Sequence, residues 1–335
     1  MLKRILAPLD GSERAEHGLA LAARLARGSG AELLLVRVVS MPPLRMAPYG
    51  EPAQIALALI AQARQDAEDY LADVTQRPLL EGISVQARTI EGHVTADILN
   101  TARDEGCDMI VISTHGYSGF NRWRLGRVAA QVARHSPVPV LIVPARGEQT
   151  PPKDDEDMRV LVTLDGSELA EAAIAPALDV ARSLAAPERI SAHLLEVVEF
   201  FAVLMADNSR DGGLSPVSSA AIGVEEQALH AARAYLETVA GRIRRQYPDI
   251  TVTVSALLAA DVAGMISDVA EDEPGYNVIA MATHGRGGVQ RWALGSITER
   301  VLHTARVPLI IARSQAAIEH ERQVAEAEAE EDAHR

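Results

Sequence analysis

Apolar residues are grouped along the chain in two recurring patterns. Short, nearly unbroken apolar runs predict strands covered on both faces, and apolar positions three and four residues apart predict amphipathic helices. In the first half, strands are predicted over 2–9, 31–39, 85–90, 109–113 and 137–143. Helices are predicted between them, over 15–26, 55–75, 95–105 and 127–134. This alternation is typical of a parallel sheet with helices on both faces.

The second half repeats the same order of elements. Strands are predicted over 159–164, 190–198, 251–258, 278–282 and 307–312, and the helices between them include 224–247 and 262–271. Segments 41–54 and 199–223 are rich in proline, glycine or serine and are predicted to be loops. The repetition predicts an α/β fold of two doubly wound, five-stranded, parallel-sheet, Rossmann-like domains in tandem.

The predicted domains occupy 1–145 and 158–313. Between them, 146–157 carries prolines and charges without apolar periodicity, which is typical of a linker. The acidic segment 314–335 is rich in alanine and glutamate and has no core-forming pattern, so we expect a solvated extension. Partner binding is the alternative role for this tail.

Composition and charge narrow the class of protein. A net charge of −14 argues against nucleic acid or an anionic membrane surface as the main partner. The one cysteine, Cys107, precludes an intramolecular disulfide and is interpreted as a core or edge residue rather than a nucleophile. No apolar run reaches the ~18 residues of a membrane span, and the N-terminal apolar segment is too short for a signal peptide. A cytoplasmic protein is therefore expected.

One motif occurs twice, each time directly after a predicted strand. Residues 114–126 read T-H-G-Y-S-G-F-N-R-W-R-L-G, and residues 283–295 read T-H-G-R-G-G-V-Q-R-W-A-L-G. Helical spacing follows each copy, so the order is strand, glycine-rich loop and helix N-terminus. Backbone N–H groups and the positive end of a helix dipole favour an anion there, and we interpret the motif as a duplicated phosphate-binding loop.

Other residues are expected at the same edge of each sheet. Asp10 and Asp165 follow the first strand of each half, and Val38 and Val197 lie near the end of the second. In a doubly wound sheet, the carboxyl ends of the strands form the ligand-binding edge. An aspartate there can accept hydrogen bonds from a ribose or a base, and a valine can contact an adenine ring.

These motifs resemble those of tandem universal stress proteins, whose domains have a fold like the adenine-nucleotide alpha hydrolases. The ATP-binding members of that family carry Gly-x-x-Gly, nine residues, and then Gly-Ser or Gly-Thr. The second half has 282–285 as A-T-H-G, nine residues, and then Gly295-Ser296. The first half has 113–116 as S-T-H-G, nine residues, and then Gly126-Arg127.

The resemblance implies an ATP site, with a divalent metal such as Mg²⁺, in each domain. Position by position, it implies nucleotide contacts at Asp10, Val38, Ser113, Gly116, Gly126 and Arg127 in the first domain, and at Asp165, Val197, Ala282, Gly285, Gly295 and Ser296 in the second. Arg127 departs from the motif: it either pairs with a phosphate or fills the phosphate site. The resemblance also implies that the last strands, 138–143 and 307–312, meet, so that one chain imitates a dimer of single domains.

Several alternatives stay open. Asp10 and Asp165, each followed by Gly-Ser, could serve only as helix caps. His115 and His284 are interpreted as structural loop residues, because neither has a metal-ligand partner at the usual spacing. Neither G-x-x-x-x-G-K-[S/T] nor G-x-G-x-x-G after the first strand occurs, which argues against an efficient kinase or ATPase.

The leading hypothesis is an intracellular, ATP-binding stress-response switch or scaffold with an unidentified signalling partner. The alternatives are an interaction module of the same fold that binds no nucleotide, and a slow adenine-nucleotide hydrolase. Further association into homo-oligomers is left open by the sequence.

Overall fold

The computed structural model describes most of the chain as two compact units. The described residues are 1–40, 51–114, 126–144, 157–185, 189–200, 216–272, 275–283, 294–314 and 317–319, and at 51–56 and 216–222 this covers the backbone alone. Unit 1 contains Met1–Glu148, Arg182–Ala186 and Pro308–Arg313. Unit 2 contains Gln149–Ala181, Pro187–Val307 and Ser314–Arg335.

Unit 1 is built on a doubly wound sheet with the strand order β3-β2-β1-β4-β5. All four pairings in this part of the sheet are parallel. Right-handed crossovers then put α1 and α2 on one face and α3 and α4 on the other. The elements are β1 (Arg4–Pro8), α1 (Glu13–Ser29), β2 (Glu32–Ser40), α2 (Glu51–Thr75), the 3₁₀ turn η2 (Pro78–Leu80), β3 (Val85–Gly92), α3 (Val94–Asp104), β4 (Met109–Ser113), α4 (Arg127–His135) and β5 (Val140–Val143).

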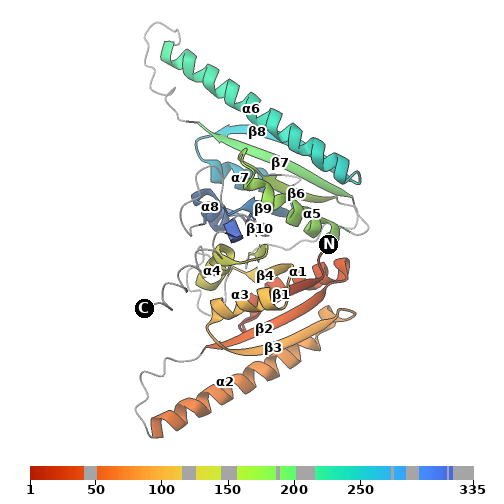
Figure 1. Ribbon diagram of the computed structural model, residues 1–335, viewed down its shortest axis with the longest axis vertical. Coiled ribbons are helices and arrows are strands. Elements are labelled where there is room, and N and C mark those ends of the chain that lie inside the picture. Colours follow the sequence, from red (N-terminus) through yellow and green to blue (C-terminus); the bar gives the residue numbers. More distant parts are fainter. Residues whose placement is uncertain are drawn as a thin grey trace. The chain divides into compact units, whose positions relative to one another are not determined.

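Unit 2 repeats this arrangement with the order β9-β6-β7-β8 (Figure 1). Its pairings are again parallel. The long helix α6 packs along β7 and β8. The elements of the second repeat are β6 (Met158–Thr163), the 3₁₀ turn η3 (Ala170–Ala173), α5 (Ile174–Leu184), β7 (Ile190–Glu199), α6 (Pro216–Gln246), β8 (Ile250–Ala259), α7 (Val262–Glu271), β9 (Val278–Ala282), α8 (Ser296–Thr304) and β10 (Leu309–Ala312).

The last strand of the second repeat belongs to unit 1. Strand β10 pairs antiparallel with β5, with Ile310 opposite Leu141. These are the two strands that the family resemblance brings together. The sheet of unit 1 therefore contains β10 in addition to the five predicted strands, and β10 joins it by an antiparallel pairing.

The central strands are almost entirely apolar, as strands covered on both faces of a sheet require. All five residues of β4 are buried, and so are all five of β9. Ile5 and Leu6 of β1 are fully buried. Alanine-rich helices pack closely on such strands, and this explains how a chain with 3% aromatic residues builds a core.

Two helices begin earlier than predicted, inside the segments 41–54 and 199–223 that were predicted to be loops. Helix α2 begins at Glu51 rather than after 54, and α6 begins at Pro216 rather than after 223. Proline suits the first turn of a helix, where its missing N–H costs no hydrogen bond, so Pro52 and Pro216 mark helix starts rather than loop. The last strands begin later than predicted, at Val140 and Leu309.

Within the described part of the chain, no helix combines the length and the apolar character that crossing a membrane requires.

Candidate functional site

The turn after the first strand has the same hydrogen bonds in both repeats. Asp10 Oδ1 accepts from the Ser12 amide at 3.0 Å and from the Ser12 hydroxyl at 2.6 Å. Asp165 Oδ1 accepts from Ser167 at the same two distances. Ser12 is the N-cap of α1 and accepts from the Ala15 amide. The cap is therefore the serine, and the aspartate orients that serine through one of its carboxylate oxygens.

Glycine is required in the middle of each turn. Gly11 has φ of 85° and Gly166 has φ of 83°. This left-handed region is accessible to glycine at little cost and is unfavourable for residues with a Cβ atom. The Asp-Gly-Ser sequence thus fixes the geometry of the turn at the end of the first strand.

The end of the second strand lies beside this turn. The Leu9 amide donates to the Val36 carbonyl at 2.8 Å, and the Leu164 amide donates to the Leu195 carbonyl at the same distance. Two residues further along each strand are Val38 and Val197, both half-buried. The structure therefore brings each predicted aspartate and valine to one edge of its sheet.

The residues before these valines differ in charge between the repeats. Arg37 lies over the ring of Tyr70, 4.9 Å from its centroid, and its guanidinium carbon is 3.1 Å from where a Cβ on Gly11 would stand. The corresponding residue of the second repeat is Glu196, which is buried. The sequence motifs gave no reason to single out either residue.

The glycine-rich loop is closed at its base in the same way in both repeats. The Gly126 amide donates to the Thr114 carbonyl at 2.7 Å, and the Gly295 amide donates to the Thr283 carbonyl at 2.9 Å. A Cβ on Gly295 would stand 3.1 Å from that carbonyl oxygen, a tight contact with backbone. The last glycine of the motif is therefore needed for a close approach between the two ends of the loop.

Each loop leads into a helix whose first amides have no side-chain cap. Gly126 and Gly295 are the N-caps of α4 and α8, and within the described part of the chain neither helix has a side-chain hydrogen bond at its cap. The next residues, Arg127 and Ser296, are both exposed. Uncapped amides at a helix N-terminus are donors for an anion, and an exposed guanidinium or hydroxyl can add to them.

The residue at the start of the motif is buried in both repeats. Ser113 and Ala282 end β4 and β9 and are 6% and 9% exposed. The Ser113 hydroxyl has no hydrogen-bond partner within the described residues. A buried hydroxyl without a partner costs free energy, so a ligand that accepts its hydrogen bond is favoured at this strand end.

Part of the predicted site lies outside the described residues. This applies to Gly116 and Gly285 of the loop motif, and to His115 and His284. Their contributions stay predictions. Cys107 is described: it is buried, and burial raises the pKa of its thiol to about 11, so it is protonated at neutral pH.

A second duplicated cluster lies one helical turn beyond the aspartate turn. Glu16 of α1 accepts from the Tyr70 hydroxyl of α2 at 2.9 Å and from Nη1 of Arg77, two residues beyond the end of α2, at 2.7 Å. The second repeat has the same three residue types. Glu171 accepts from the Tyr235 hydroxyl at 3.1 Å and from Arg242 Nη2 at 2.7 Å. Each cluster ties the long helix to the segment that follows the aspartate turn.

Electrostatics in this cluster keep the glutamate ionised. The Arg77 guanidinium holds the pKa of the Glu16 carboxyl below its usual range, and the Tyr70 hydrogen bond acts in the same direction. Burial and the neighbouring Glu16 raise the pKa of Tyr70, so this hydroxyl stays a donor. The missed signal was in the sequence: Asp-Gly-Ser-Glu-x-Ala-Glu and Tyr-Leu-x-x-Val-x-x-Arg each occur once in each repeat.

The chain is similar to known proteins over most of its length. The model of the universal stress protein family matches residues 1–144 and 158–313. A universal stress protein of Mycobacterium tuberculosis is 30% identical over 209 residues, which are 62% of this chain and 62% of that relative. That alignment spans less than two thirds of the relative. A universal stress protein of Mycolicibacterium smegmatis is 22% identical over 315 residues, covering 92% of this chain and 96% of that relative.

A solved structure shows a similar fold. The crystal structure of a universal stress protein from Archaeoglobus fulgidus has a TM-score of 0.62 at 22% identity, and it covers 93% of this chain and 97% of that chain. At this level of identity the likeness concerns the fold alone.

Proposed function

Because the chain belongs to the universal stress protein family, we propose that it binds ATP at the strand ends of both repeats. In this proposal the protein acts as a stress-response switch or scaffold, since bound nucleotide would order the glycine-rich loops and bias a surface that a signalling partner recognises. The observation that carries the proposal is the duplicated pairing of an Asp-Gly-Ser turn with a glycine-rich loop that ends at an uncapped helix N-terminus.

The proposed contacts follow from the chemistry at each position. The carboxylates of Asp10 and Asp165 would accept hydrogen bonds from the adenosine part, and Val38 and Val197 would contact the base. The phosphates would bind the first amides of α4 and α8, together with Arg127 in one repeat and Ser296 in the other. Mg²⁺ would enter with the nucleotide, because this ion is usually held by phosphates and few protein ligands.

Two features at the end of β4 and at the start of α4 and α8 favour a bound ligand at the proposed site. The Ser113 hydroxyl is a donor without a partner in the described residues, and the base of each loop leaves the helix amides uncapped. Among the members of this set that the structure describes, none is a nucleophile with a base beside it, and we propose binding rather than efficient hydrolysis.

Titration calorimetry with ATP and Mg²⁺ tests the proposal in the second repeat. Asp165→Ala removes a charged acceptor, and we expect it to weaken ATP binding by about ten- to a hundredfold. Gly295→Val blocks the close approach at the base of the loop and should weaken phosphate binding. Glu168→Ala is the matched control, because Glu168 is exposed in the same turn and has no role in the proposed contacts.

The outcomes separate the candidate functions. ATP binding that Asp165→Ala and Gly295→Val both leave unchanged contradicts the assigned site. An absence of ATP binding by the wild-type protein would favour an interaction module that binds no nucleotide.

A further inference from the structure

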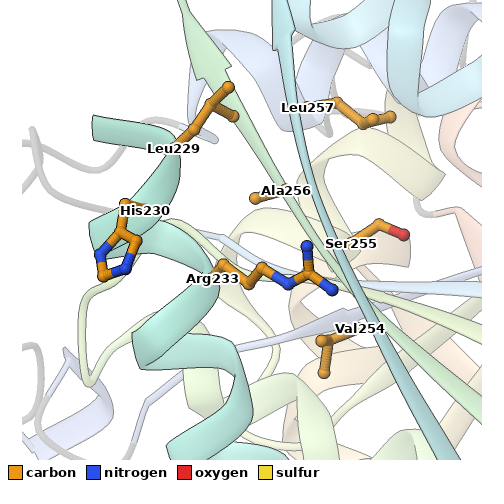
Figure 2. A pocket seen from close by; sticks show the side chains of 7 residues that line it. All are labelled: Leu229, His230, Arg233, Val254, Ser255, Ala256 and Leu257. Carbon is orange, nitrogen blue, oxygen red and sulfur yellow. The ribbon is translucent and has the colours of Figure 1, made fainter. Parts of the chain in front are cut away.

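A groove in unit 2 lies between α6 and the edge strand β8, apart from the proposed nucleotide contacts. Its volume is about 370 Å³. Figure 2 shows Arg233 extending from α6 towards the strand, whereas the ring of His230 is directed away from it. The lining residues are Leu229, His230 and Arg233 from α6 and Val254, Ser255, Ala256 and Leu257 from β8.

Strand β8 has the character of an unprotected edge. It lies at the end of the strand order and pairs with β7 along its ten residues. It contains no charged residue from Ile250 to Ala259. Exposed edges are usually protected by charges, and the corresponding strand β3 of unit 1 carries Arg88 and Glu91. A long uncharged edge strand can pair with an added strand.

The outer backbone of β8 is turned towards the groove. The Arg244 guanidinium of α6 donates to the Val252 carbonyl at 2.8 Å, so this carbonyl points away from β7. Backbone direction alternates along a strand, and the amides and carbonyls of Val254 and Ala256 therefore face the same side. These groups are the hydrogen-bonding partners that an added strand would use.

Unit 1 fills the corresponding place with an ion-pair bridge between its helix and its edge strand. Arg64 of α2 contacts Glu91 of β3 at 3.1 Å and Glu68 of α2 at 2.9 Å. When the two repeats are aligned on Tyr70 and Tyr235, Leu229 occupies the position of Arg64, and Arg233 occupies that of Glu68. The strand pairings show that Leu258 of β8 occupies the position of Glu91 in β3.

The bridge is thus absent from unit 2, and an arginine stands where unit 1 has a glutamate. Arg233 is exposed and forms no ion pair within the described residues. In a chain with a net charge of −14, this is a local positive site beside an uncharged strand edge.

We propose that the groove between α6 and β8 binds an extended acidic segment of a partner protein, which adds as a strand to the edge of β8. Backbone hydrogen bonds to Val254 and Ala256 would give affinity, and a carboxylate of the segment would pair with Arg233. An apolar side chain of the segment would pack on Leu229. A second copy of this chain fits less well, because joining two β8 edges brings two copies of Arg233 together and β8 offers no carboxylate to pair with either.

The test uses the full chain and a fluorescein-labelled peptide of eight residues with alternating valine and glutamate. We expect fluorescence anisotropy to show at least tenfold tighter binding than for the same peptide with lysine in place of glutamate. Arg233→Glu should weaken binding at least tenfold. Arg245→Glu is the matched control, since Arg245 is exposed on the same helix outside the groove and the variant has the same net charge.

A second variant rebuilds the bridge of unit 1. Leu229→Arg combined with Leu258→Glu should abolish peptide binding, and in the wild-type protein the peptide should slow hydrogen exchange at the amides of Val254 and Ala256. Equal binding by the glutamate and lysine peptides overturns the proposal, as does equal binding by Arg233→Glu and Arg245→Glu. Two further outcomes also overturn it by assigning the groove to another occupant: binding seen only after deletion of 314–335, or self-association that Arg233→Glu strengthens.

Discussion

At the residue scale, the strand-end turns depend on glycines with positive φ. Gly166 has φ of 83°, whereas Gly241 lies inside α6, where a Cβ would meet only ordinary van der Waals contact. Gly166→Ala should therefore destabilise the protein by about 1–2 kcal/mol, and Gly241→Ala should stabilise it by up to about 1 kcal/mol. Urea unfolding monitored by circular dichroism measures the change in the free energy of unfolding for each variant. A destabilisation by Gly241→Ala equal to that of Gly166→Ala contradicts this account.

The pairing of Glu16 with Arg77 should make stability depend on pH. The folded-state pKa of Glu16 is lowered, so its contribution is present above the ordinary glutamate pKa and is lost as the pH falls through the folded-state value. We expect Glu16→Gln to lower stability by about 1 kcal/mol at pH 7, because the carboxylate is partly exposed. The difference from the wild type should shrink towards zero as the pH falls below 4.

Urea midpoints measured at a series of pH values test this dependence. The control is Glu13→Gln, an exposed residue in the first turn of the same helix, which should show no such trend. A wild-type advantage over Glu16→Gln that is as large at pH 3 as at pH 7 would rule out the ion pair as its source.

The sequence indicates the residues of the candidate site better than it indicates the neighbouring residues that hold the site in place. Asp10, Asp165 and the loop glycines follow from motif and spacing, since turn chemistry is local. Glu16, Tyr70 and their counterparts were missed because their partner lies on another helix, and a single glutamate in a helix is usually solvated. The duplication is the one signal that would have distinguished them.

At the element scale, the prediction succeeded where the apolar pattern is clear. The bounds of β4 and β9 are as predicted because unbroken apolar runs define them, and those of α7 are as predicted because helical apolar spacing begins directly after the Asp261 cap. It was wrong at the starts of α2 and α6, whose first turns combine proline with polar residues and are equally typical of loops. Composition alone cannot separate a solvated helical turn from a loop.

Strand β10 gives a prediction that links the second repeat to the stability of unit 1. Ile310 is fully buried and lies opposite Leu141 of β5. Ile310→Asp puts an unpaired charge in this core, and we expect it to cost at least about 3 kcal/mol. Hydrogen exchange at the amides of β5 in unit 1 should therefore accelerate.

Ile297→Asp is the control for this substitution. It makes the same chemical change in the same repeat, at a residue that is 38% exposed at the start of α8. If Ile310→Asp accelerates exchange in β9 while leaving β5 protected, β10 does not stabilise unit 1.

At the scale of the whole molecule, the two repeats share a plan and differ in charge at particular positions. Both have the aspartate turn, the closed loop base and the Glu-Tyr-Arg cluster. They differ at Arg37 and Glu196, at Arg127 and Ser296, and at the bridge between the long helix and the edge strand. Duplication predicts two sites of one kind, and these differences predict that the sites are not equivalent in affinity.

Equilibrium dialysis of the full chain against radiolabelled ATP with Mg²⁺ determines whether both repeats bind ATP. We expect saturable binding that approaches two nucleotides per chain, in two steps of different affinity. Binding that fails to saturate, or a chain that binds no ATP, would contradict this expectation.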